Sequence, residues 1–267
     1  MTHQPRTRSP LLTAFTLLCL HSPRVFAQPS SAATAAFNTY TQSIESRLAE
    51  QHRSSASFLS VTSDPQALTR LRSGEVILEN LTPDHAPASG SLLHHWRGTA
   101  FAPGATAADF ERLLADFSAY PVHFSPEVLQ AKLVSQNNGD LQATMRVRQR
   151  HVITVLMDSA YDITSGRLDP RHGYSISRST SISELDPRTN RALSAGEEHG
   201  FLWRLNTYWS YEERDGGLYL QIESVSLSRA IPTGLGWAIG PYVESIPRES
   251  LDFTLRSAVT AIQKGPR

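Results

Sequence analysis

The stretch FLWRLNTYWSYEERDGGLYLQIESVSLSR, residues 201–229, carries the most direct information on the architecture of this chain. Apolar residues alternate with polar ones on both sides of Asp215-Gly216-Gly217, and this period of two is typical of β-strands. An Asp-Gly dipeptide favours the tight turn that joins two antiparallel strands. Residues 201–213 and 218–229 are therefore predicted to form a hairpin with Asp215-Gly216 as its turn and Glu213 opposite Leu218.

Opposite residues of a hairpin share one face, so this register sorts the side chains into two sets. The face predicted to line an interior cavity carries Trp203, Leu205, Trp209, Tyr211, Leu218, Leu220 and Ile222. The other face carries Arg204, Asn206, Tyr208, Glu212, Gln221 and Glu223, with Arg204 and Glu223 expected as an exposed cross-strand pair. Two alternatives remain open. The aromatic side chains also fit a filled core, and a shift of one residue in register exchanges the faces and makes Arg204 and Glu223 a polar anchor inside the cavity.

The flanking sequence extends the same pattern into a sheet. Strands are predicted at 92–101, 128–135, 141–150, 151–163 and 174–185, with a tight turn at 137–140. A helix is predicted at 107–117, and a long final helix at 247–263 buries Leu251, Leu255, Ala258 and Ile262. Hairpins imply antiparallel pairing. The chain is thus predicted to be α+β, a curved antiparallel sheet of about seven strands wrapped round a long C-terminal helix, which is the helix-grip fold.

The first 27 residues have the order of parts found in a secretory signal peptide. Arg6 and Arg8 precede an apolar run at 11–20, and Val25-Phe26-Ala27 fits a cleavage site after Ala27. The run is about half as long as a membrane-spanning helix, which weighs against the alternative of an uncleaved anchor. The chain is therefore expected to be exported, to the periplasm or the extracellular space.

Cleavage would remove the single cysteine, Cys19, so the mature protein would fold without disulfides and without thiol chemistry. It would also leave 22 basic residues against 25 acidic ones, whereas nucleic-acid binders usually carry a basic surplus. Residues 32–82 are expected to form a mainly helical N-terminal appendage, with helices at 35–52 and from Pro65, and a short strand at 75–81. Residues 91–264 form the predicted main domain.

Several segments of the main domain resemble the START-like superfamily, also called SRPBCC, the polyketide cyclase and lipid-transport group. The resemblance covers residues 92–258. It is carried by HHWRG at 94–98, FAPGA at 101–105, GFLWRLNTYW at 200–209, ERDGG at 213–217, SLSRAIP at 226–232 and IPRESL at 246–251. These segments are similar to a subgroup of exported bacterial proteins. The resemblance implies a cavity for a lipid, sterol, polyketide or other apolar molecule, and transient membrane contact also fits it. Members bind, transport, cyclise or sense, so it implies no single activity.

Candidate catalytic and gating residues are few. His94 and His95 are adjacent on a strand, so their side chains point to opposite faces, and at most one of them faces the cavity as an acid or base. The glycine-rich segment 234–240 lacks the context of a dinucleotide-binding loop and is interpreted as a flexible bend or a broken helix, with Trp237, Ile239 and Tyr242 as a hypothetical gate. The scattered histidines lack metal-ligand spacing, so no metal or cofactor is predicted.

The leading interpretation is an exported binding or carrier protein for a lipid or other apolar small molecule, with no nucleic-acid partner and no defined protein partner. The first alternative is an enzyme of the cyclase or hydrolase kind that uses a cavity histidine. The second is a non-catalytic interaction module whose interior is filled by side chains. Binding is favoured over catalysis because the fold supplies a cavity whereas no linear catalytic motif is visible.

Overall fold

A computed structural model describes residues 28–84, 88, 90–137, 140–150, 154–231 and 236–265, the side chains of 236–244 excepted. The expected signal peptide, with its cleavage site after Ala27, lies outside the described residues. The described helices are α1 (Ser31–Gln51), α2 (Pro65–Arg72), α3 (Ala107–Ala115), α4 (Tyr120–His123) and α5 (Gly236–Lys264), with single 3-10 turns at Ser55–Ser57 and Phe117–Ala119. The strands are β1 (Ile77–Asn80), β2 (Ser91–Pro103), β3 (Val128–Asn137), β4 (Asp140–Arg150), β5 (Thr154–Asp169), β6 (His172–Leu185), β7 (Arg204–Arg214) and β8 (Gly217–Arg229).

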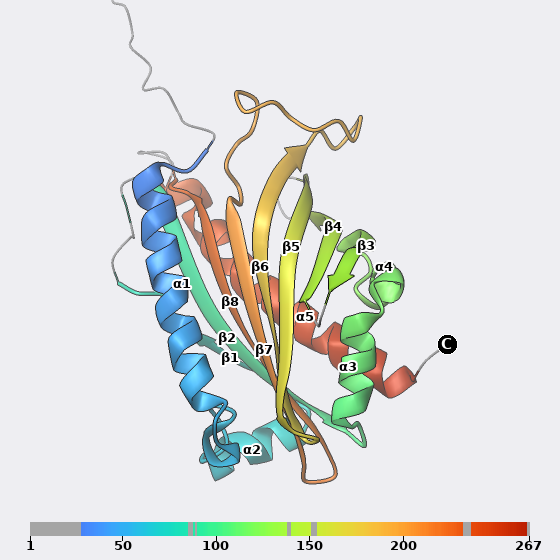
Figure 1. Ribbon diagram of the computed structural model, residues 1–267. Coiled ribbons are helices and arrows are strands. Elements are labelled where there is room, and N and C mark those ends of the chain that lie inside the picture. Colours follow the sequence, from blue (N-terminus) through green and yellow to red (C-terminus); the bar gives the residue numbers. More distant parts are fainter. Residues whose placement is uncertain are drawn as a thin grey trace, which may run out of the picture.

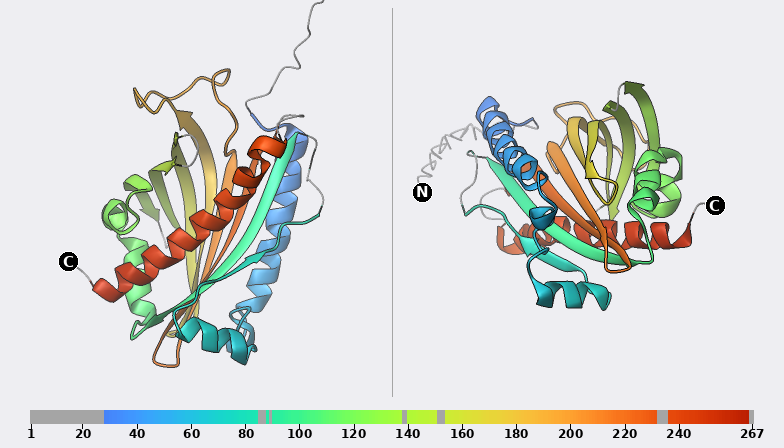
Figure 2. Two further views of the ribbon diagram at one scale, coloured as in Figure 1. Left: turned by 180° about the vertical axis from the view of Figure 1, so that it is seen from behind. Right: turned by 60° about the horizontal axis from the view of Figure 1, so that its bottom comes forward.

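The described strands form one curved antiparallel sheet of eight strands in the order β1-β2-β8-β7-β6-β5-β4-β3. Helix α5 lies along the concave face, whereas α1 and α2 cover the convex face (Figures 1 and 2). The predicted α+β helix-grip fold is therefore confirmed, with eight strands in place of about seven. The eighth is β1, which comes from the segment 32–82 and pairs with β2 at one edge of the sheet.

The hairpin of β7 and β8 has the predicted register, with Glu213 opposite Leu218. Asp215 and Gly216 both have positive φ, at 57° and 75°, as a two-residue type I′ turn requires. Side chains alternate across the sheet from this turn onward. Leu218, Leu220 and Ile222 enter the core between the sheet and α5, whereas Tyr219, Val225 and Leu227 enter the cores under the N-terminal helices.

The N-terminal helices begin at residues that cap them. The Ser30 hydroxyl accepts the backbone N–H of Ala33 at the start of α1, and the Asp64 carboxylate accepts two backbone N–H groups at the start of α2. Along α1, Phe37, Ile44 and Leu48 are buried at helical spacing and pack on the convex face of the sheet. The face of β7 and β8 that the sequence placed at the surface is therefore covered.

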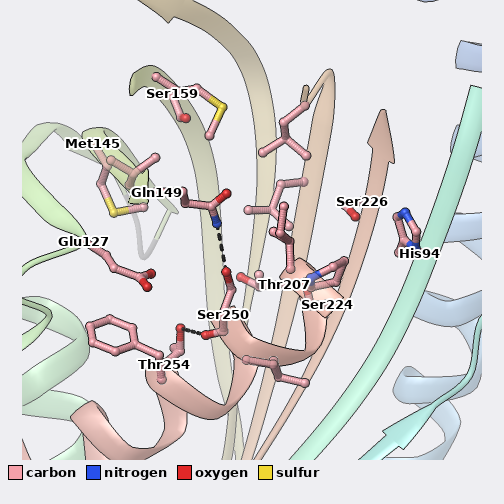
Figure 3. A pocket seen from close by; sticks show the side chains of 18 of the residues that line it. His94, Glu127, Met145, Gln149, Ser159, Thr207, Ser224, Ser226, Ser250 and Thr254 are labelled. Atoms are coloured by element: carbon pink, nitrogen blue, oxygen red, sulfur yellow. Dashed lines mark hydrogen bonds between the residues drawn. The ribbon is translucent and has the colours of Figure 1, made fainter. Parts of the chain in front are cut away.

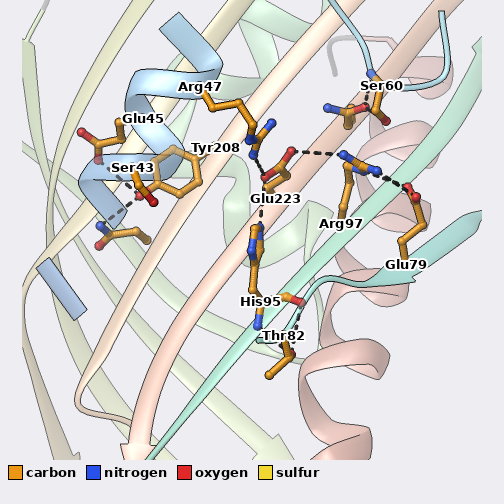
Figure 4. Close-up of polar contacts among 12 residues, drawn as sticks. Ser43, Glu45, Arg47, Ser60, Glu79, Thr82, His95, Arg97, Tyr208 and Glu223 are labelled. Atoms are coloured by element: carbon orange, nitrogen blue, oxygen red, sulfur yellow. Dashed lines mark hydrogen bonds and ion pairs between the residues drawn. The ribbon is translucent and has the colours of Figure 1, made fainter. Parts of the chain in front are cut away.

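This covering makes the predicted exposed Arg204–Glu223 pair wrong. Glu223 is 0% exposed, lies opposite Tyr208 rather than Arg204, and receives a hydrogen bond from Arg47 of α1. Its second partner is His95 of β2, whose Nε2 lies 3.0 Å from the same carboxylate oxygen (Figure 4). Burial opposes ionisation of Glu223, but His95 and Arg47 outweigh burial and lower its pKa.

Further polar contacts attach α1 to the sheet around this carboxylate. The Glu223 carboxylate can only accept, so Nε2–H of His95 donates to it, and the Tyr40 hydroxyl lies 2.9 Å from Nδ1 on the other side of the ring. Arg178 of β6 donates two hydrogen bonds of 2.8 Å to Glu45 of α1. The convex face thus combines apolar packing with buried polar groups that have partners on α1.

The final helix differs from its predicted start at Pro247. It begins at Gly236, and its backbone remains helical through Pro241 and Pro247 although neither proline can donate a hydrogen bond. Leu251 and Leu255 of α5 pack closely on β2 at Gly98, where an added Cβ would lie 2.5 Å from Leu255 Cδ1. This packing along β2 and β8 offsets the missing hydrogen bonds.

Replacing Glu223 by alanine is expected to destabilise the protein by about 3–5 kcal/mol, because it leaves the buried His95 without its carboxylate partner and removes the partner of Arg47 on α1. The matched control is Glu50→Ala, since Glu50 also pairs with an arginine, Arg53, but both side chains are 74% exposed. The control is expected to change stability by less than about 0.5 kcal/mol. Urea unfolding of both variants measures the difference. Equally small effects in the two variants would show that Glu223 and its partners do not hold α1 on the sheet.

Candidate functional site

A cavity of about 390 Å³ lies between the concave face of the sheet and α5, whose residues 246–254 contribute to its wall. Its wall combines residues from β4 to β8 with residues from α3, α4 and α5 and from the segment between β6 and β7. The apolar part of the wall includes Phe110, Leu113, Leu114, Tyr120, Phe124, Met145, Val147, Val155, Met157, Leu205, Trp209, Ile222, Ile246, Leu251 and Phe253.

The position of α5 explains why this space is not filled. The helix packs against β2 and β8, on one side of the curved sheet, and also contacts α3 and α4. Phe110 lines the cavity at the end formed by α3. Its ring lies 5.0 Å from that of Trp209 and 5.2 Å from that of Tyr211, in edge-to-face contact with both. Between these contacts the helices span the concave face of the sheet, and the space between helices and sheet stays open as the cavity.

Several polar side chains face this mostly apolar space, among them Glu127 and Ser250. Glu127, between α4 and β3, is held through its backbone by Phe124 and Arg148 and directs its carboxyl group into the cavity (Figure 3). Burial raises the pKa of this carboxyl from 4.5 to about 7. On the facing helix, Ser250 accepts a hydrogen bond of 2.8 Å from Gln149 of β4. The cavity therefore offers a carboxyl group that is close to half-protonated near neutral pH.

A second hollow of about 390 Å³ adjoins the first, and residues such as Ser177, Thr207 and Trp209 line both. Its outer end carries a charged cluster, in which Tyr211 donates a hydrogen bond of 2.7 Å to Glu111, and Glu111 also pairs with Arg167. Gly173 leaves room for the Tyr211 side chain, because a Cβ at position 173 would clash with the Tyr211 hydroxyl. Together the two hollows form an elongated space along the concave face.

Most of the predicted cavity residues lie on the concave side. Leu205, Trp209 and Ile222 line the main cavity, and Tyr211 lines the second hollow. Leu220 is fully buried in the core between the sheet and α5 without lining either space.

Trp203 lies on the opposite side of the sheet, in the core beneath α1 with Phe37 and Leu48. The alternation that predicted its orientation does not reach it, because β7 begins at Arg204 and the chain bends at Gly200, where φ is 76°. Trp237 and Tyr242 belong to α5 by their backbone, but their side chains lie outside the described residues, as does that of Ile239.

The two adjacent histidines are separated by the sheet. His94 lines the main cavity opposite Ser226, whereas His95 is buried on the convex face against Glu223. This is the alternation that a strand imposes. Within the described residues, no three His, Cys, Asp or Glu side chains are grouped so as to hold a metal ion.

Sequence reasoning missed the cavity residues of β4, β5 and α4. Met145, Val147 and Gln149 follow the period of two along β4, so this pattern could have assigned them to one face. Glu127 had no such signal, because it stands in an irregular segment and its burial depends on α5, more than a hundred residues later. Among the helices that the structure describes, none has the length and apolar character needed to cross a bilayer.

Replacement of Glu127 by glutamine tests the environment of the cavity. Because the raised pKa means that the native state binds the proton more tightly, this stabilising contribution is complete below about pH 4.5 and is lost as the pH rises through 7. Glutamine stays neutral, so Glu127→Gln and the wild type should have similar stability at pH 4. At pH 8 the variant should be more stable, by about 1–2 kcal/mol once solvent screening of this partly exposed carboxyl is allowed for.

Urea midpoints of both proteins across this pH range measure the difference. A stability difference that does not vary with pH would contradict the raised pKa. NMR titration of the Glu127 carboxyl gives the same quantity directly.

No family model and no curated protein matches this chain. Solved structures are similar in part. A STAR-related lipid transfer protein from Xanthomonas axonopodis aligns over 70% of this chain and 98% of its own, at 16% identity and a TM-score of 0.44. The Zhui aromatase/cyclase from Streptomyces sp. R1128 aligns over 65% and 95%, at 13% identity and 0.44. A START superfamily protein from Mycobacterium smegmatis aligns over 65% and 97%, at 12% identity and 0.41. At such identities the fold assignment rests on the strand order and helix placement of this chain itself.

Proposed function

We propose that this chain is an exported binding or carrier protein that holds a lipid or another apolar or amphipathic small molecule in its internal cavity. The observation that carries this proposal is the space of about 390 Å³ between sheet and helix, with a largely apolar wall. Its volume falls within the range of small-molecule sites, about 300–1,000 Å³.

Burial of apolar ligand surface supplies the affinity. Each 100 Å² of apolar area removed from water contributes about 2.5 kcal/mol, before the cost of association is subtracted. Trp209 offers the largest side chain of the wall and is held against Phe110, so its ring is already fixed before a ligand enters. A preformed wall of this kind lowers the cost of ordering side chains on binding.

The rim of the cavity fits a ligand that is taken from a membrane or another apolar phase. Phe201 lines the cavity and is 42% exposed, and its ring stacks on that of His199. Transient membrane contact through this rim is part of the proposal, as is export by cleavage after Ala27. The intact mass of the protein isolated from its host tests the export step, since cleavage there gives a chain that starts at Gln28.

An enzyme of the cyclase or hydrolase kind is the second candidate. It is favoured by one observation, namely that His94 and a carboxyl group with a pKa of about 7, Glu127, line the same cavity. Binding remains the better-supported function because it requires only the cavity. The third candidate, an interaction module with a filled interior, does not fit a space of this size.

Trp209→Ala is expected to weaken binding of the apolar fluorophore N-phenyl-1-naphthylamine by roughly tenfold or more, since it removes an aromatic side chain from the cavity wall. Trp203→Ala is the matched control, because Trp203 is equally buried but lies on the other face of the sheet. Fluorescence titration of both variants, with circular dichroism to verify folding, makes the comparison. Equal losses in the two variants, or none in either, would remove the cavity as the binding site.

A further inference from the structure

A row of hydroxyl side chains crosses the floor of the cavity. Ser177 of β6 lies opposite Thr207 of β7, and Thr207 lies opposite Ser224 of β8. Directly opposite residues place their Cβ atoms about 4.5–5.5 Å apart on one face of the sheet. The three hydroxyl groups therefore form a continuous line across three neighbouring strands, and all three residues line the cavity (Figure 3 shows Thr207 and Ser224).

The line continues at both ends. Ser226 follows on the same face of β8, opposite His94. At the other end, Ser175 and Ser165 line the second hollow and are hydrogen-bonded to each other at 3.1 Å. Because Ser177 and Thr207 line both hollows, the hydroxyl row runs through the junction of the two spaces.

These hydroxyl groups are available to a ligand. In the described part of the chain, those of Ser177, Thr207 and Ser224 hydrogen-bond no protein group. The three residues are only half-buried although their strands lie inside the sheet, so their accessible surface faces the cavity.

Polar side chains on the convex face differ, because protein groups from the N-terminal segment hydrogen-bond to them. There the cross-strand pair Ser210 and Gln221 is fully paired, since Ser210 contacts His52 at 2.8 Å and Gln221 accepts a hydrogen bond of 2.6 Å from Ser60. Buried polar groups in proteins are generally satisfied in this way. Among the described residues, Thr99 Oγ1 on the convex face also has no partner, but it is fully buried, whereas the unpaired hydroxyl row of the concave face borders the cavity.

The wall opposite this row is largely apolar, although Glu127 and Ser250 also face the cavity there (Figure 3). It is formed by Leu251 of α5, Phe110 and Leu113 of α3, and Phe124. We propose, on the basis of the binding function inferred above, that the ligand is an elongated, facially amphipathic molecule with several oxygen atoms along one side and a hydrocarbon surface on the other. Its oxygen-bearing side lies on the Ser177–Thr207–Ser224 row, and its apolar side lies under the helices.

The energetics separate this class from simple lipids. A pure hydrocarbon chain would displace water from the hydroxyl row and return no hydrogen bond, which disfavours its binding. A lipid with a single polar head would satisfy one end of the row and leave the rest without partners. A ligand with oxygen atoms spaced along one side replaces the displaced water at each position.

The test uses three bile acids that share one ring system and differ in hydroxyl number, with N-phenyl-1-naphthylamine as an apolar probe. Cholate carries three ring hydroxyls on one face, deoxycholate two and lithocholate one. Calorimetric titration should rank them cholate, deoxycholate, lithocholate from tightest to weakest, the reverse of their hydrophobicity. Thr207→Val keeps the shape of the side chain and removes its hydroxyl, so it should weaken cholate roughly three- to tenfold and leave lithocholate unchanged.

Two further variants keep the outcome interpretable. Thr144→Val makes the same change at an exposed position of β4 and should alter nothing, whereas Ser177→Ala should repeat the selective loss of cholate. If lithocholate binds more tightly than cholate, or if only the apolar probe binds, the facial assignment is overturned while the cavity function stands. If neither the bile acids nor the apolar probe binds, the proposed function fails and the assignment fails with it.

Discussion

The neighbouring inner strands β7 and β8 must be shielded from water on both faces, and this constraint shapes the rest of the molecule. Nearly every residue of β8 is buried, so neither face can be left to solvent. Helix α1 and the segment after it cover the convex face. They supply hydrogen-bond partners for polar side chains of the sheet such as Glu223 and Ser210. Helix α5 covers the concave face from one side, along β2, and the curvature leaves the cavity beside it.

The two coverings differ in a way that bears on function. On the convex face most polar groups, such as Ser210 and Gln221, are satisfied within the protein, as a permanent interface requires. On the concave face a row of hydroxyl groups centred on Thr207 faces a space whose opposite wall is largely apolar, with the Glu127 carboxyl as its ionisable group (Figure 3). An interior with this division is suited to a molecule that is itself divided into a polar and an apolar side.

The sequence predicted the parts of this arrangement that depend on local signals. Asp215-Gly216 set the register of the hairpin, and alternation from that turn placed Trp209 and Ile222 in the cavity wall. The same rule failed for Trp203, because alternation ends where the strand ends and the chain bends at Gly200. Local reasoning also could not show that Glu223 is buried, since its cover is a helix far away in the sequence.

Native mass spectrometry of the protein purified from its own host without detergent is the most direct test of the proposal that this cavity holds a small molecule. We expect a discrete added mass that is released when the protein unfolds, and fragmentation of the released molecule gives its chemical class. Protein that carries no added mass, even after incubation with a lipid extract of the host, would contradict the claim and direct attention to His94 and Glu127 as an acid–base site.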